Sequence, residues 1–262
     1  MKIVPMTSAP IRNALVLLLT TLLAGCAQGP AVQAQEASGS TEDGYTEGRA
    51  SRDGRGKFYM GRELSKTMTY HGIPWLERTE RDREERPDEV VAAMKLQSDD
   101  VVVDLGAGSG YFTFRIAAKV PNGKVLAVDI QPEMLAFLEQ KRDENGMTNV
   151  ETVLGSIDNP NLSPGVDAVL MVDAYHELSH PREIMQAVVE ALVPGGRVFL
   201  VEYRGEDPSV PIKPLHKMTE TQARKEMTAA GLEWVETLDF LPSQHFMVFK
   251  KPMALEKQES AQ

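Results

Sequence analysis

The sequence predicts an α/β fold built on a doubly wound, mostly parallel β-sheet that ends in an antiparallel hairpin. Short apolar segments of strand length alternate with segments of helical apolar spacing from about residue 90 onward, which indicates parallel strands joined by helices on both faces of the sheet. A glycine-rich turn directly follows the first apolar segment. The last two strand-like segments, residues 233–241 and 244–251, are separated only by Pro242-Ser243, which predicts a terminal hairpin.

The first predicted strand and the turn after it, residues 101–111, form the most informative part of the chain. Residues 101–103 are all valine, as expected of a strand that is covered on both faces. Residues 111–120 have helical spacing. A glycine turn between a parallel strand and a helix lets a nucleotide-like ligand approach the backbone and the free N–H groups of the helix N-terminus. The three glycines of this turn alternate with other residues, at Gly106, Gly108 and Gly110.

The glycine spacing separates two classes of nucleotide-binding fold. In the dinucleotide fingerprint G-x-G-x-x-G the third glycine would fall at Tyr111. Asp104 at the strand end would repel a pyrophosphate, but it suits a ligand with a cationic amino group. The segment Asp104-Leu-Gly-Ala-Gly-Ser-Gly110 resembles the first motif of class I S-adenosylmethionine (SAM) methyltransferases. The resemblance implies a Rossmann-like methyltransferase fold and SAM as cofactor, held at Asp104, Gly106, Ala107, Gly108 and Gly110.

The second strand, residues 124–129, ends in an acid a little over twenty residues past the glycines. At that distance an acid reaches the ribose of a bound nucleotide, where its carboxylate accepts two hydrogen bonds from the vicinal hydroxyls. We therefore expect Asp129 to bind the ribose. The resemblance implies that Ile130 packs on the adenine, that residues 155–158 form the adenine-edge motif, and that Asp173 also lies at the cofactor. The adenine-edge candidates are Ser156, Ile157 and Asp158.

After the second strand, segments with strand and helix patterns continue to alternate. Thr219 is expected to cap the helix 219–230, with Gln222 in the capping-box position. The resemblance runs from about residue 90 to 251 and defines a SAM-binding domain at 90–252, and residues 191–201 match the fifth-strand motif of small-molecule methyltransferases. Strands are expected at 149–154, 166–172 and 197–202, helices at 132–145 and 181–193, and a turn at 194–196.

The acceptor site is expected after the fourth strand, because ligands of open α/β sheets bind at the carboxyl edge. Tyr175, His176 and Glu177 stand there and are the candidate catalytic residues, with ordinary packing or capping at the strand end as the alternative for each. Methyl transfer mainly requires alignment of donor and acceptor, so a dedicated acid or base is optional. His216, in the loop after the fifth strand, could line the same mouth.

Residues 176–180 also match the zinc-hydrolase motif H-E-x-x-H. That motif needs both histidines one turn apart on a single helix, whereas Pro181 biases His180 away from helical geometry. The segment is better interpreted as the loop between the fourth strand and its helix. No metal site is therefore expected, and a zinc hydrolase is only the minor alternative.

The N-terminus predicts export and lipid attachment. Lys2 and Arg12 precede an apolar stretch, residues 14–23, that is too short to span a bilayer, so residues 1–25 are interpreted as a signal peptide. Leu23-Ala-Gly-Cys26 resembles the lipobox of bacterial lipoproteins, which implies a lipid anchor at Cys26, and Ala27 after it points to the periplasmic face of the outer membrane. Residues 26–56 are expected to be a flexible tether and 253–262 a disordered tail.

Residues 57–89 are expected to form a helical lid segment. It comprises a short helix at 58–68, a break at 70–75, and a charged helix at 76–86 whose charges are interpreted as a solvated face. A further helix at 88–96 would lead to the first strand. His71 and Trp75 could cover the acceptor pocket, although Trp75 could instead only anchor the segment to the core.

The formal net charge of −10 argues against nucleic acid as a partner, since phosphate binding needs clustered Lys and Arg. The resemblance implies methyl transfer from SAM to a small-molecule acceptor. The alternative is a non-catalytic envelope lipoprotein that binds SAM or another nucleoside. Export would separate the protein from its cofactor, because SAM is made in the cytoplasm. Either SAM reaches the periplasm, or export is inefficient, or the domain has become a binding module.

Overall fold

The computed structural model describes residues 43–253, which belong to one of the two units into which the chain divides, residues 37–262. The predicted signal peptide, the lipid anchor at Cys26, residues 26–42 of the tether and nearly all of the predicted tail lie outside the described residues. Within residues 43–253, no helix combines the length and the apolar character needed to cross a membrane.

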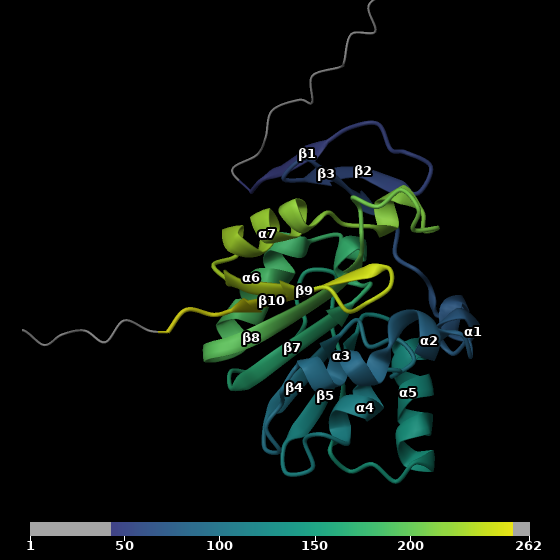
Figure 1. Cartoon of the computed structure of the whole chain (residues 1–262), viewed down its shortest axis with the longest axis vertical. Helices are drawn as coiled ribbons and strands as arrows, with labels where there is room; N and C mark the ends of the chain where they lie inside the picture. Colours follow the sequence, from purple (N-terminus) through teal and green to yellow (C-terminus); the bar gives the residue numbers. More distant parts are fainter. Residues whose placement is uncertain (1–42, 254–262) are drawn as a thin grey trace, which may run out of the picture. The chain divides into compact units, whose positions relative to one another are not determined.

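Seven strands form the main sheet in the order β6-β5-β4-β7-β8-β10-β9 (Figure 1). All neighbouring strands are parallel except β10, which pairs antiparallel with both β8 and β9. The predicted fold class is thus confirmed, and β10 is inserted between β8 and β9. The strands are β4 (Val101–Leu105), β5 (Lys124–Asp129), β6 (Val150–Leu154), β7 (Val166–Val172), β8 (Leu192–Tyr203), β9 (Glu233–Leu238) and β10 (Gln244–Lys250).

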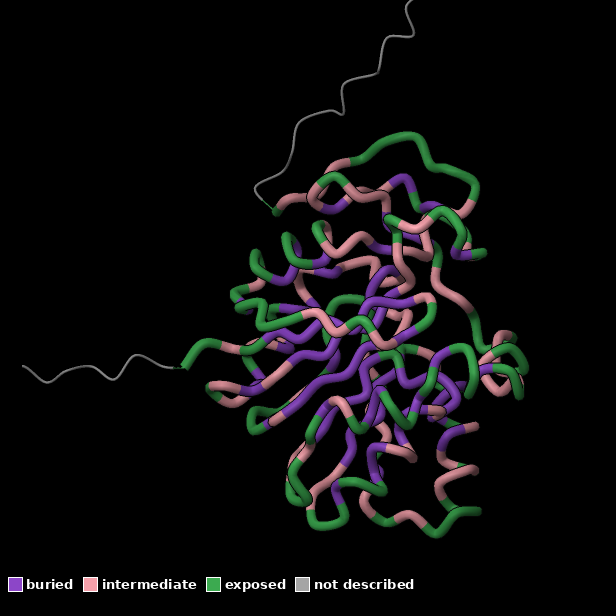
Figure 2. The backbone as a smooth tube through the Cα atoms, viewed as in Figure 1, coloured by how far each residue is buried: buried purple, intermediate pink, exposed green. Residues whose placement is uncertain are grey.

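Helices cover both faces of this sheet (Figure 1), and alternate side chains of its strands enter one of two apolar cores. Figure 2 shows that the strands of the main sheet are mostly buried. Val102 packs with the helices of one face and Val103 with those of the other, as the period of two along a strand requires. The first face carries α3 (Pro87–Ala93), α4 (Thr113–Ala117) and α5 (Pro132–Glu144), and the second carries α6 (Pro181–Ala191) and α7 (Glu220–Ala229).

Two local predictions about helix and strand ends have different outcomes. The Thr219 hydroxyl accepts the Gln222 N–H at 3.1 Å and caps α7 as expected. The turn predicted at residues 194–196 is wrong, because β8 already begins at Leu192 and continues through these residues. Gly195 adopts a φ of +79° there, which glycine allows without steric cost.

Residues 45–65 form a three-stranded antiparallel sheet, which corrects both the tether predicted up to residue 56 and the helix predicted at 58–68. Its strands are β1 (Tyr45–Glu47), β2 (Gly54–Tyr59) and β3 (Arg62–Ser65). Met60 and Gly61 join β2 to β3 with φ values of 50° and 97°. Two consecutive residues with positive φ form the tight turn that two-stranded hairpins prefer, so this short segment folds as strands.

The small sheet is fixed to the main domain by buried polar contacts. Arg62 of β3 forms an ion pair of 2.8 Å with Glu226 of α7, whose side chain is fully buried. The Ser65 hydroxyl donates to the backbone carbonyl of His176 at 3.1 Å. The chain that leaves β3 therefore runs directly along the carboxyl edge of the main sheet.

The segment between the two sheets contains short helical turns rather than one charged helix. Residues 70–75, predicted as a break, include a 3₁₀ turn and the start of α1, and the predicted helix at 76–86 is reduced to α2. The turns are η1 (Tyr70–Gly72), α1 (Ile73–Leu76) and α2 (Arg81–Glu85).

Candidate active site

A cavity of about 600 Å³ opens at the carboxyl ends of β4, β5 and β7. This volume lies within the roughly 300–1,000 Å³ of small-molecule sites. Strand β4 lies between β5 and β7, so the chain leaves it at the point where the strand order reverses, which is where open α/β sheets bind ligands. The cavity walls come from the glycine turn, the ends of β5 and β7, the loop after β6, the segment after β3, and the loop after β8.

The glycine turn is held against β5 by its backbone. The N–H groups of Gly106 and Ala107 both donate to the Val128 carbonyl, at 2.9 and 3.0 Å. Gly106 has a φ of +79°, and a Cβ there would lie 2.7 Å from that of Ala174. The predicted residues Gly106, Ala107 and Gly108 line the cavity.

Gly110 does not line the cavity. A Cβ at this position would lie 2.7 Å from the Phe114 ring and 3.0 Å from Leu138. The third glycine therefore allows close packing of the turn against α4 and α5.

Asp129 lies at the end of β5 and lines the cavity. Its carboxylate accepts the Gly108 N–H at 3.0 Å and the Gln131 N–H at 2.9 Å, which fixes both the glycine turn and the start of α5. Burial raises the pKa of this carboxyl, against the lowering effect of these backbone N–H groups. The arrangement leaves the carboxylate rigidly oriented at the cavity wall.

Two exposed isoleucines line the next part of the cavity. The exposed fraction is 39% for Ile130 and 54% for Ile157, which is high for apolar side chains. They offer apolar surface to a flat ring, and Ser156 lines the cavity beside them. Asp158 does not line it and accepts the Ser156 hydroxyl at 2.7 Å.

Two buried acids lie on the other side of the glycine turn. Asp104 accepts the Thr113 hydroxyl at 2.6 Å, and burial raises its pKa to about 6 although Thr113 and Arg81 oppose this. Asp173 accepts the Gln244 side-chain amide at 2.6 Å, while its Oδ1 has no hydrogen-bond partner. Burial, with the nearby carboxylates of Glu85 and Glu202, raises the pKa of Asp173 well above its usual range. Both predicted acids line the cavity.

The sequence analysis missed the arginines of this region, because it assigned their charges to a solvated face. Arg81 and Glu85 are only 6% and 3% exposed, form an ion pair of 2.8 Å, and line the cavity together with Arg78. The Arg81 guanidinium lies 4.1 Å from the centre of the Tyr111 ring. This contact is with the end of the glycine turn, which lies far from Arg81 in the sequence, so charge spacing does not reveal the burial of Arg81.

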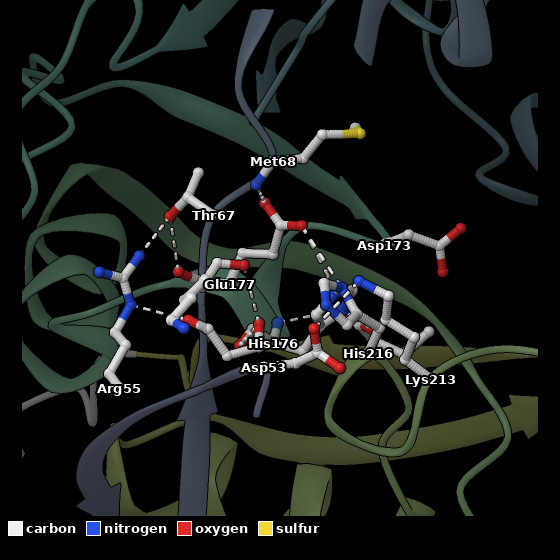
Figure 3. Close-up of polar contacts among 12 residues, drawn as sticks. Asp53, Arg55, Thr67, Met68, Asp173, His176, Glu177, Lys213 and His216 are labelled. Atoms are coloured by element: carbon white, nitrogen blue, oxygen red, sulfur yellow. Dashed lines mark hydrogen bonds and ion pairs between the residues drawn. The ribbon is translucent and has the colours of Figure 1, made fainter. Parts of the chain in front are cut away.

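At the opposite end of the cavity, His176, Glu177 and His216 converge from two 3₁₀ turns, η2 (Tyr175–Glu177) and η3 (Pro214–His216) (Figure 3). His176 and Glu177 stand where the sequence analysis expected the acceptor, and His216 lines the same mouth. Residues of the segment after β3 and of the η3 loop, which the sequence analysis did not select, complete this wall. They are Lys66, Thr67, Met68 and Lys213.

Tyr175 is fully buried in the apolar core and does not line the cavity, so its expected role at the acceptor is corrected. In a 3₁₀ turn adjacent side chains point in different directions, so Tyr175 and His176 cannot share one environment. Trp75 lines the cavity and remains 53% exposed, whereas His71 does not line it. His245 hydrogen-bonds to Glu206 away from this cavity.

The H-E-x-x-H segment does not form one helix. Leu178 is extended after η2, and His180 precedes α6 with a φ of −135°, where its imidazole contacts the Ser179 hydroxyl at 3.0 Å. The predicted loop between the fourth strand and its helix agrees with this geometry. The zinc-hydrolase arrangement needs both histidines on one helical face, which this backbone does not provide.

Comparison with known proteins places the chain in a family. Residues 96–247 match the family model described as "Methyltransferase domain". A SAM-dependent methyltransferase from Aquifex aeolicus superposes with a TM-score of 0.67 at 22% identity, covering 70% of this chain and 99% of that structure, which shows the shared fold. The chain belongs to the family of methyltransferase domains.

Sequence relatives do not share one acceptor. An uncharacterised methyltransferase-like protein of Schizosaccharomyces pombe is 31% identical over 54% of this chain and 53% of its own length. A tRNA U34 carboxymethyltransferase of Desulfotalea psychrophila is 30% identical over 38% of this chain and 31% of its own length. The chain thus spans about half or less of these relatives.

The raised pKa of Asp104 predicts a pH-dependent cost to stability. Between its ordinary value of 3.8 and about 6 the folded state binds more protons at Asp104 than the unfolded state, so this carboxyl's contribution to the free energy of unfolding falls as pH rises. We expect Asp104→Asn to stabilise the cofactor-free protein at pH 7 by up to about 3 kcal/mol, with the gain vanishing toward pH 4. Urea unfolding of both proteins across this range measures the effect. A difference that stays constant with pH would contradict the assignment.

Proposed function

We propose that this protein transfers the methyl group of SAM to a small-molecule acceptor that binds at His176, Glu177 and His216. One observation carries the proposal: a single cavity joins the glycine turn and Asp129 to this polar cluster. A cofactor and an acceptor can therefore meet in one enclosed space. The net charge of −10 supports a small acceptor over a nucleic acid.

The cavity offers a complementary group for each part of SAM. Asp129 is oriented to accept hydrogen bonds from the ribose, and Ile130 and Ile157 can enclose the adenine. The ammonium group fits beside Asp104 and Asp173, whose unpartnered Oδ1 would gain a donor. The carboxylate of the methionine moiety would then lie toward Arg81, as the pairing of a carboxylate with a guanidinium favours.

In the reaction, a lone pair of the acceptor attacks the methyl carbon as the carbon–sulfur bond breaks. The bonding electrons move to sulfur, which gives S-adenosylhomocysteine, and an acceptor that carried a proton on the attacking atom releases it. Positive charge is lost from sulfur, so an enclosed cavity does not oppose the reaction. The protein contributes mainly by aligning the two reactants and excluding water.

Calorimetric titration of the full chain with SAM and S-adenosylhomocysteine tests the cofactor site. We expect both to bind and Asp129→Ala to weaken binding roughly tenfold to a hundredfold, because hydrogen bonds from the ribose to a carboxylate are lost. Asp143→Ala, whose side chain is 69% exposed on α5, is the matched control and should bind like wild type. If the folded wild-type chain binds neither ligand, the proposal fails.

The place assigned to Arg81 predicts a ligand-dependent effect. Arg81→Met keeps much of the stacking on Tyr111 but removes the charge, so SAM should bind about tenfold more weakly. Methylthioadenosine, which lacks the amino-acid part of SAM, should bind Arg81→Met and wild type equally. Arg83→Met, at a side chain 82% exposed, is the control. Equal losses for both ligands would show that Arg81 supports the fold of the cavity and not the carboxylate.

The proposed location is the bacterial envelope, with a lipid anchor at Cys26. The support is the Leu23-Ala-Gly-Cys26 segment after a short apolar stretch that follows Lys2 and Arg12. In a bacterial host that is fed labelled palmitate, the wild-type chain should incorporate label and sediment with membranes, and Cys26→Ser should do neither. An unlabelled wild-type chain in the soluble fraction would refute the anchor.

A further inference from the structure

Three potential metal-binding atoms face one another at the acceptor end of the cavity. The Nε2 atom of His176 lies 3.2 Å from Nδ1 of His216. Oε1 of Glu177 lies 3.9 Å from the first of these nitrogens and 3.6 Å from the second (Figure 3). The three atoms come from η2 and η3, so two separate loops of the chain bring them together.

Two of these side chains are oriented by buried partners on their far side. Nδ1 of His176 lies 2.6 Å from the carboxylate of Glu202, whose side chain is fully buried. Donation of the Nδ1 proton to Glu202 leaves the Nε2 lone pair directed at the cluster. Oε2 of Glu177 accepts the Met68 N–H at 2.9 Å, which leaves Oε1 on the cluster side. A carboxylate behind a ligating histidine is the usual support of a metal site.

We propose that His176, Glu177 and His216 bind a divalent transition-metal ion of the zinc class. With bonds of about 2.0–2.1 Å, two ligands of a tetrahedral ion lie roughly 3.4 Å apart. The observed separations of 3.2, 3.6 and 3.9 Å bracket that value, so small side-chain movements suffice. Two imidazoles and one carboxylate match the ligand set of catalytic zinc sites.

The charges of the cluster support the assignment. Two carboxylates, those of Glu177 and Glu202, lie next to two imidazoles in a poorly hydrated site with side chains at most 21% exposed. Buried carboxylates require a counter-charge, and a divalent ion would balance both while the imidazoles stay neutral. The metal-free alternative is a hydrogen bond between the two histidines, which binds no ion.

The site differs from the zinc site that the H-E-x-x-H motif would form. His180, the second histidine of that motif, does not line the cavity, and His216 comes from a loop 40 residues away from His176 in the sequence. The sequence analysis expected no metal because it weighed only the H-E-x-x-H motif, and the fold brings in His216 as the third ligand instead.

Three protein ligands leave a coordination position open toward the cavity. This next step rests on the proposed methyl transfer: an acceptor with an O–H or S–H group would occupy that position and release its proton to water. The metal-bound oxygen or sulfur then keeps a lone pair for attack on the methyl carbon, and the pair from the broken carbon–sulfur bond stays on sulfur. A bound divalent ion favours the deprotonated form of such groups.

Metal binding is tested on the full chain, stripped with a chelator and titrated with Co²⁺ in the absence of SAM. Visible d–d absorption reports a four- or five-coordinate ion, and competition with Zn²⁺ gives the zinc affinity. We expect one equivalent to bind. His216→Ala and Glu177→Gln should each weaken binding at least about tenfold, and Glu202→Gln by about 10–100-fold through loss of the carboxylate behind His176. Circular dichroism verifies that each variant is folded.

His180→Ala separates the proposed site from the motif site. It should bind Co²⁺ like wild type. Loss of binding in His180→Ala with retention in His216→Ala, or no binding of either ion by the folded wild-type chain, would overturn the proposal. Titration with SAM in parallel distinguishes the two possible failures. If the chain binds SAM but no metal ion, only the metal site is rejected. If the chain binds the metal ion but not SAM, only the proposed methyl transfer is rejected.

Discussion

The attachment of the glycine turn to the end of β5 is the constraint on which the rest of the site depends. The Val128 carbonyl receives two N–H groups of the turn, and the neighbouring Asp129 carboxylate receives a third from Gly108. The turn after β4 and the carboxylate at the end of β5 therefore have one fixed separation. Because Asp129 also holds the Gln131 N–H, the start of α5 is tied to the same point.

The two ends of the cavity are lined by different kinds of polar side chain. Near the glycine turn, the guanidinium of Arg81 lies among three acidic side chains, those of Asp104, Asp173 and Glu85. Such a group of buried charges destabilises the empty protein and becomes favourable when a zwitterionic ligand supplies the missing partners. At the other end, Glu177 accepts the Met68 N–H and the His176 imidazole lies against the buried carboxylate of Glu202, so these two side chains are oriented before any ligand arrives.

The sequence was sufficient to predict those parts of the fold that have a periodic pattern of apolar residues. The seven-stranded sheet and the position of Asp129 follow from periodicity and from one glycine motif. Residues 45–65 escaped prediction because a short hairpin with a Met60-Gly61 turn lacks the usual Asn-Gly or Asp-Gly signal. Arg81 could not be assigned from spacing, since it reaches the cavity through contacts made by distant segments. The prediction that Tyr175 lies at the acceptor site was wrong, because proximity in the sequence does not determine which side of a tight turn a side chain faces.

The small sheet is fixed through Arg62 and Ser65 to the carbonyl of His176, and both lie before the family-matched residues 96–247. The part of the cavity wall formed by Lys66, Thr67 and Met68 is thus encoded upstream of those residues, whereas His176, Glu177 and His216 lie within them. Exchange of residues 45–68 would therefore alter one wall of the cavity while Arg81, the glycine turn and Asp129 stayed in place. Substitutions in the small sheet can accordingly reshape the cavity without changing the strands that carry its opposite end.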